Sequence, residues 1–168
     1  MPASHQHDPL QPHAHEPNPR PPSSDASMTL STPAGRTVQL SVDSLDAMPQ
    51  VSVSGCYIVS TGHGASGPFT FGGVRLLDVV ERFVPDRWTQ VEVISADGFG
   101  NRVYRPELEG PSPEGTIILA IRIDGARLTR EQGLVRLVVP SEREDALRQV
   151  KWVSEIRVLD ALGDSTQR

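Results

Sequence analysis

Short runs of valine and isoleucine bounded by turn residues are the feature that most constrains how this chain can fold. They occupy residues 37–41, 50–60, 90–95, 116–123, 134–139 and 150–158, and Asp97-Gly98 and Asp124-Gly125 are turn signals between them. Several alternate apolar with polar side chains, as half-buried strands do. Only residues 74–83 carry the apolar stripe of an amphipathic helix, and residues 41–48 form one further helical turn. The pattern predicts an α+β fold with a β-rich mixed sheet or barrel-like core and few helices.

The chain, 168 residues long, is predicted to hold one domain between two polar ends. Residues 1–31 are rich in Pro, His, Ser and Asn. We expect a disordered tail there, because so few apolar side chains cannot offset the entropy lost on ordering. Its H-x-H pairs, His5/His7 and His13/His15, can bind a divalent ion but leave the other ligands undefined. The domain is expected over 32–162, and residues 163–168 as a flexible C-terminus.

Composition and net charge restrict the binding partners and the cellular compartment that can be expected for this chain. The formal net charge of -5 argues against nucleic acid as a partner, because no positive field draws this surface to phosphate backbones. No run of eighteen apolar residues predicts a membrane span, and residues 1–20 lack the apolar core of a signal peptide. Cys56 is the only cysteine, so the chain can form neither an internal disulfide nor a cysteine zinc cage. These features predict a cytoplasmic protein.

The glycine-rich segment 60–73 is the first candidate for a binding site. Five glycines and a proline predict a loop whose backbone can approach a ligand closely. His63 in this segment can bond a cofactor phosphate or donate a proton, or it is simply an exposed loop histidine. A Cys56/His63 pair is also conceivable for nucleophilic catalysis, but the sequence shows no orienting group and no oxyanion hole for it. The common nucleotide-binding, zinc-protease and hydrolase signatures are absent.

Several short motifs follow one another in a fixed order between residues 37 and 160. After the strand that leads to Cys56 come FGGVRLLDVVE (71–81), ISADGFG (94–100), ILAIRIDGARLTREQGLVRLVVP (118–140) and VKWVSEIRV (150–158). The most specific pieces are Asp124-Gly125, Leu128, Gly133, Arg136, Pro140 and Val150–Trp152. In this order they resemble the oxidoreductase molybdopterin-binding domain of the sulfite oxidase family.

The resemblance implies a molybdenum-molybdopterin cofactor, oxygen-atom transfer or other redox chemistry on a small substrate, and a redox partner protein. In that family one cysteine thiolate on an early strand ligates molybdenum, a role that falls to Cys56 here, although a lone cysteine in a strand is often only a small buried hydrophobe. The cofactor would lie against residues 62–73, with His63, Gly64 and Lys151 as binding residues, although Lys151 could equally be an exposed strand residue.

Two arginines are candidates for binding the substrate. The planar guanidinium groups of Arg102 and Arg105 could orient a small oxyanion, although solvated surface arginines look the same in a sequence. Trp152 is expected to be a core aromatic residue.

Departures from the family pattern support a second hypothesis. The family's N-terminal pterin-holding residues are replaced by the predicted tail, and the arginines that follow its cysteine are replaced by residues 57–60. Residues 141–148 form an acidic segment where the enzymes have glycine and aromatic residues, and the family's C-terminal dimerisation domain is absent. The alternative is therefore a relative that has lost the cofactor and serves as a small-ligand or protein-binding module.

Overall fold

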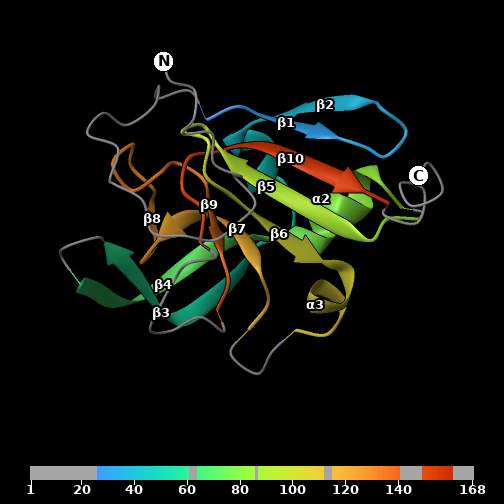
Figure 1. The fold of residues 1–168 in the computed structure, drawn as a ribbon. Helices are drawn as coiled ribbons and strands as arrows, with labels where there is room; N and C mark the ends of the chain where they lie inside the picture. The colour runs from blue at the N-terminus through green and yellow to red at the C-terminus, as the bar shows by residue number, and fades with distance from the viewer. Residues whose placement is uncertain (1–25, 61–63, 86, 112–114, 141–148, 161–168) are drawn as a thin grey trace, which may run out of the picture.

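The computed structural model describes residues 26–60, 64–85, 87–111, 115–140 and 149–160, which form two β-sheets (Figure 1). The first sheet has the strand order β2-β1-β10-β5-β6. β1 pairs with β10 in parallel and the other neighbours are antiparallel, so this sheet is mixed. Its strands are β1 (Met28–Ser31), β2 (Thr37–Leu40), β5 (Gln90–Ser95), β6 (Gly100–Tyr104) and β10 (Val153–Leu159).

The second sheet is antiparallel throughout its described pairs and has the order β3-β4-β7-β8, with β9 also on β7. Its strands are β3 (Val51–Ser60), β4 (Gly64–Arg75), β7 (Ile118–Ile123), β8 (Ala126–Arg127) and β9 (Arg136–Val138). The predicted turn at Asp124-Gly125 joins β7 to β8, and both of its residues have positive φ angles, 48° and 88°, as a tight two-residue hairpin requires.

Helices are few in the described part of the chain. They are α1 (Val42–Asp46), α2 (Leu76–Phe83) and α3 (Arg105–Glu109). The predicted stripe is confirmed in α2, which buries Leu76, Val79 and Val80. The predicted α+β architecture with few helices is therefore confirmed. None of the described helices has the length and apolar character needed to cross a membrane.

Two hydrophobic clusters bury the second sheet on both faces. On β7, Leu119 and Ile121 point into the larger cluster, which also contains side chains of the first sheet and of α2. Ile118 and Ala120 point the other way, into a smaller cluster, because successive side chains of a strand alternate between its faces. The smaller cluster consists of Val53, Cys56, Phe71, Ile118, Ala120, Ile123, Leu128 and Val138.

Two sequence predictions are corrected by the structure. Residues 64–73, predicted as loop, belong to β4 and pair with β3 and β7. Gly73 is needed there because β7 passes so close that a Cβ at Gly73 would lie 2.8 Å from the Cα of Ala120. Met28–Ser31, predicted as tail, forms β1, since β10 and β2 supply its hydrogen-bonding partners. Residues 1–25, with the histidine pairs, and residues 163–168 lie outside the described part.

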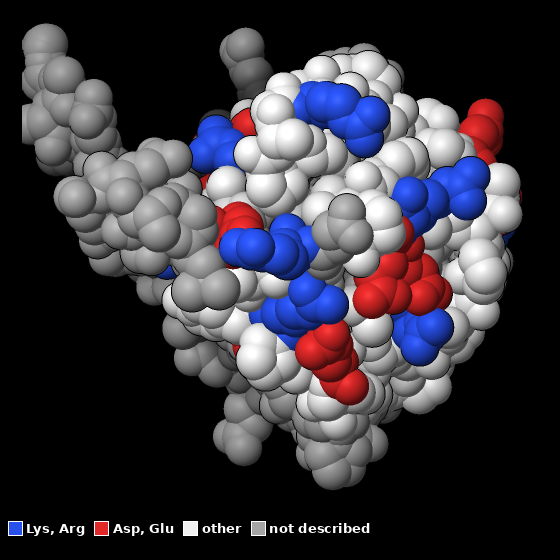
Figure 2. Space-filling model, turned by 90° about the vertical axis from the view of Figure 1, so that its right-hand side faces the viewer, with Lys and Arg blue, Asp and Glu red and all other residues white. Residues whose placement is uncertain are grey.

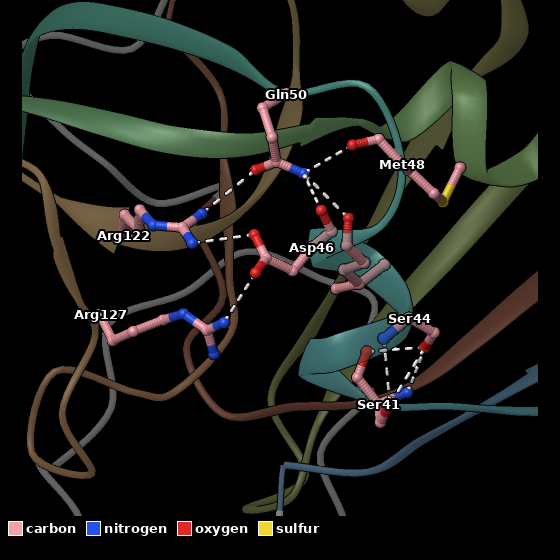
Figure 3. A network of polar contacts seen from close by, with 8 residues as sticks. Ser41, Ser44, Asp46, Met48, Gln50, Arg122 and Arg127 are labelled. Atoms are coloured by element: carbon pink, nitrogen blue, oxygen red, sulfur yellow. Dashed lines mark hydrogen bonds and ion pairs between the residues drawn. The ribbon is translucent and has the colours of Figure 1, made fainter.

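Ion pairs of Asp46 connect α1 to the second sheet (Figure 3). The Asp46 carboxylate accepts from Arg122 over 2.8 Å and from Arg127 over 2.9 Å, so one acid joins α1 to β7 and β8. The hydrogen bond and charge of Arg122, with those of Arg127, hold the pKa of Asp46 below its usual value. At the other end of α1, the Ser41 hydroxyl accepts from the Ser44 backbone N–H and caps the helix.

Replacing Asp46 with asparagine should remove an acid-sensitive part of the stability. A carboxyl group whose folded pKa is lowered stabilises the fold above its unfolded pKa, roughly 3.9, and this contribution disappears as the pH falls through the lower folded value. The midpoint difference in urea between the parent and Asp46→Asn should thus be largest at neutral pH and shrink below about pH 4. Glu81→Gln, which changes an exposed acid on α2, is the control. A difference that does not vary with pH would contradict the assignment.

Candidate functional site

The candidate site lies where residues 132–137 run beside residues 149–153, at the junction of the two sheets. Backbone hydrogen bonds connect the two segments, from Trp152 N to Gly133 O over 2.9 Å and from Val153 N to Val135 O over 3.0 Å. Gly133 has a φ of 107°, and a Cβ there would lie 2.6 Å from the Cβ of Lys151. Glycine thus permits both the turn and the close approach that brings Lys151 alongside β9.

Arg136 is a buried cation without a carboxylate partner among the described residues. It is 6% exposed and pairs across the sheet with Ala120. Nη1 donates to the carbonyl oxygen of Gln132 over 2.9 Å, and Nη2 lies 3.4 Å from Oε1 of Gln149. Nε has no partner. Burial lowers the pKa of Arg136 to about 10, so the guanidinium is still charged at neutral pH. A buried charge with only neutral partners is costly, and an anion would relieve that cost.

Lys151 adds a second positive charge next to Arg136. Its Nζ lies 4.3 Å from the centre of the Trp152 ring, a cation–π contact. Burial and the positive charge of Arg136 lower the pKa of Lys151, and the Asp97 carboxylate opposes them. Trp152 is buried, as predicted for a core aromatic, and its Nε1 donates to the carbonyl oxygen of Arg130 over 2.7 Å. Two neighbouring cations make this junction an attractive place for an anion.

Cys56 is connected to this cluster through Gln149. The Gln149 Nε2 donates over 3.1 Å to the carbonyl oxygen of Tyr57, the residue that follows Cys56 on β3. Cys56 is 3% exposed and packs in the smaller cluster with Val138, which lies on the same face of β9 as Arg136. The thiol and the guanidinium therefore occupy the same side of the second sheet. We call Cys56, Arg136, Gln149 and Lys151 the junction cluster.

The structure brings together only some of the residues singled out in the sequence. Cys56 and Lys151 belong to the junction cluster. Gly64 pairs with Ser60 at the far end of the β3–β4 hairpin, and His63 lies outside the described residues. Their assigned cofactor role stays a prediction.

Arg102 and Arg105 lie on the first sheet and on the helix that directly follows its strand β6. Arg102 on β6 forms an ion pair of 3.1 Å with Glu92. Arg105, at the start of α3, pairs with Glu109 over 2.8 Å and lies 4.6 Å from the centre of the Trp88 ring. Figure 2 shows positive and negative groups interspersed over one face of the molecule. Both arginines thus have carboxylate partners, unlike Arg136, and their proposed catalytic role receives no support from this placement.

Arg136 and Gln149 were not singled out as site residues from the sequence. The signal that could have found Arg136 is a lone charge within the apolar run 134–139, since an arginine in a buried strand is rare unless it is paired. Gln149 left no comparable signal, because its role depends on β3, which is distant in the sequence.

The junction cluster fits a phosphate-bearing cofactor better than a metal ion alone. Among the described residues, no three His, Cys, Asp or Glu side chains gather as a metal site. Cys56 could supply only one thiolate ligand, which suits a metal whose other sulfur ligands come from an organic cofactor. The unsatisfied Arg136 Nε and the neighbouring Lys151 are donors that suit a phosphate.

Comparison with known proteins agrees with this chemistry. A solved structure of the sulfane dehydrogenase SoxCD from Paracoccus pantotrophus matches with a TM-score of 0.63 and 19% sequence identity. The match covers 82% of this chain and 39% of that chain, and it shows the likeness of the fold. No protein with a curated description matches the sequence. The family model described as the oxidoreductase molybdopterin binding domain matches residues 15–166. The chain therefore belongs to the oxidoreductase molybdopterin-binding domain family.

Proposed function

We propose that this chain binds a molybdenum-molybdopterin cofactor at the junction cluster and uses it for oxygen-atom transfer or a related redox reaction on a small substrate. The observation that carries the proposal is Arg136, a buried guanidinium without a carboxylate partner among the described residues. Family membership supports the cofactor. Because the chain spans only 39% of the SoxCD chain it resembles, the activity of a whole enzyme is part of the proposal.

Each residue of the junction cluster has a distinct task in this proposal. Arg136 and Lys151 hold the anionic end of the cofactor, where their donors replace the water that a phosphate loses on burial. Cys56 would ligate the metal as a thiolate, because coordination to a metal deprotonates a thiol. The cofactor, when bound, supplies the redox chemistry.

The proposal also includes binding partners and a cellular compartment. We propose a small-molecule substrate and a redox partner protein, without a role for nucleic acid, for which the formal charge of -5 is unfavourable. We propose a reducing, cytoplasmic compartment, which suits a sequence whose one cysteine, Cys56, can form no internal disulfide.

One observation favours the alternative, a relative that binds a ligand or protein without the cofactor. Cys56 packs among apolar side chains in the smaller cluster, and its Sγ lies 3.6 Å from the carbonyl oxygen of Ser54. A small buried hydrophobe would occupy the same position. The two functions differ in one measurable property, which is the molybdenum content.

Replacing Cys56 with serine should abolish molybdenum binding. The protein is expressed in a host that makes the molybdenum cofactor, and the metal is measured per chain by elemental analysis. The parent should carry near-stoichiometric molybdenum and Cys56→Ser almost none, because a hydroxyl is a poor ligand for a thiophilic metal. Ser52→Ala, an exposed position on the same strand, should keep the metal.

Two results would contradict the proposal. Molybdenum retained by Cys56→Ser would remove the ligand role of the cysteine. A parent protein without molybdenum would favour the cofactor-free alternative.

A further inference from the structure

Gln149 lies between Arg136 and the strand that carries Cys56. It is 8% exposed, and its carboxamide makes two contacts with different elements. Oε1 faces Nη2 of Arg136 at 3.4 Å, and Nε2 donates to the Tyr57 carbonyl oxygen over 3.1 Å. Arginine can only donate and a carbonyl oxygen can only accept, so these neighbours determine the orientation of the amide. Gln149 thus connects β3, next to Cys56, with the guanidinium on β9.

The neutrality of this side chain is the unusual feature. A glutamate has the same length and would place a carboxylate against Arg136, the usual solution for a buried guanidinium. Among the described residues, both acceptors of Arg136 are neutral, namely the Gln132 carbonyl oxygen and the Gln149 carboxamide. Lys151 adds positive charge instead of compensating it. Glutamine at this position therefore accepts from the guanidinium without adding a negative charge.

We propose that Gln149 is a positioning residue, which sets the anion affinity of the junction cluster by holding Arg136 toward the ligand without neutralising it. The proposal rests on the proposed function, since the anion in question is the phosphate end of the cofactor. It adds that this affinity depends on a neutral acceptor at position 149, and that the same residue couples the anion end of the site to the strand of Cys56.

The first test measures binding of inorganic phosphate by isothermal titration calorimetry at low ionic strength. Phosphate affinity should fall by at least about tenfold in Gln149→Glu, because the new carboxylate pairs with Arg136 and repels the anion. Gln132→Glu is the matched control, because the Gln132 side chain accepts from the Thr129 backbone and touches Arg136 only through its carbonyl oxygen. The phosphate affinity of Gln132→Glu should stay within about threefold of the parent value.

Gln149→Met separates the charge role from a merely structural one. Methionine is uncharged and of similar size, but it loses both hydrogen bonds. If Gln149 acts through charge, phosphate affinity should decrease in the order parent, Gln149→Met, Gln149→Glu. If Gln149 only supports the backbone, glutamate keeps the shape and the acceptor, so Gln149→Met should bind as weakly as Gln149→Glu or more weakly, and the proposal is overturned.

The outcomes also separate this inference from the proposed function. Phosphate binding in that order by a protein that takes up no molybdenum would keep the role of Gln149 and reject the cofactor. Molybdenum in the parent, with equal phosphate affinity in the parent and Gln149→Glu, would keep the cofactor and reject the role of Gln149. A parent that binds no phosphate would also overturn the inference.

Discussion

Replacing Arg136 with methionine should abolish phosphate and molybdenum-cofactor binding in a chain that still folds. Arg136 is the buried cation of the junction cluster, and methionine of similar size removes its charge and its donors together. Exchanging a buried charge for a packed apolar side chain is often neutral or stabilising. We therefore expect the free energy of unfolding to change by less than about 2 kcal/mol, with the lost bond to the Gln132 carbonyl offsetting part of the gain.

The measurement combines phosphate titration, molybdenum analysis and urea unfolding on the same preparations. Arg157→Met is the control, because Arg157 is exposed and pairs with Glu155 and Glu92 on the first sheet. Both variants lose one positive charge, but only Arg136→Met should lose the ligands. Equal weakening in the two variants would mean that overall charge, and not a built site, draws the anion. Full binding by Arg136→Met would exclude Arg136 from the site.

Gly73→Ala should strongly destabilise this protein, although it adds only one methyl group. A Cβ at Gly73 would lie 2.8 Å from the Cα of Ala120 and 2.9 Å from the carbonyl carbon of Leu119, both backbone atoms of β7. Neither can move without separating β4 from β7 in the middle of the second sheet. We expect a loss of at least about 3 kcal/mol of unfolding free energy, at the upper end of what single substitutions cost.

The neighbouring glycine provides the control. At Gly72 the nearest atom to an added Cβ is the Arg122 Cβ at 3.7 Å, an ordinary van der Waals distance. Gly72→Ala should change stability by less than about 1 kcal/mol, and could even stabilise the strand by restricting the unfolded chain. Urea unfolding of both variants makes the comparison. Similar stabilities for the two would contradict the close approach of β4 and β7.

Local chemistry was enough to predict the elements whose signals lie within a few residues. The apolar stripe of α2, the strand at Gln90–Ser95 and the turn at Asp124-Gly125 are all present as predicted. Each depends on a short-range preference, such as side-chain periodicity or a turn that needs positive φ.

The segment 60–73 shows where local chemistry is ambiguous. Its glycines are equally suited to a loop and to a strand pressed against a close neighbour. Gly73 belongs to the second class only because β7, some forty-five residues later, packs against it. β1 was missed for a related reason: four residues beside a polar stretch become a strand when β10 and β2 supply their hydrogen bonds.

The sequence likewise indicated only some residues of the candidate site. The resemblance in the sequence pointed to Cys56 and Lys151, and placed Arg136 among its motifs without a role. Arg102 and Arg105 were the candidates for orienting a substrate anion, with solvated surface arginines as the other reading, and both have carboxylate partners in the structure. An ion pair and a free charge look alike in a sequence, because pairing depends on side chains brought near by the fold.

The sequence by itself determined the β-rich α+β class, the family resemblance and the single cysteine, since periodicity, motif order and composition are properties of the chain. Only the tertiary structure decided that Arg136 is buried among neutral acceptors and that Gln149 connects Arg136 on β9 with the strand of Cys56. The physical reason is that burial and electrostatic compensation are set by groups distant in sequence, whereas strand and turn preferences are set by neighbours.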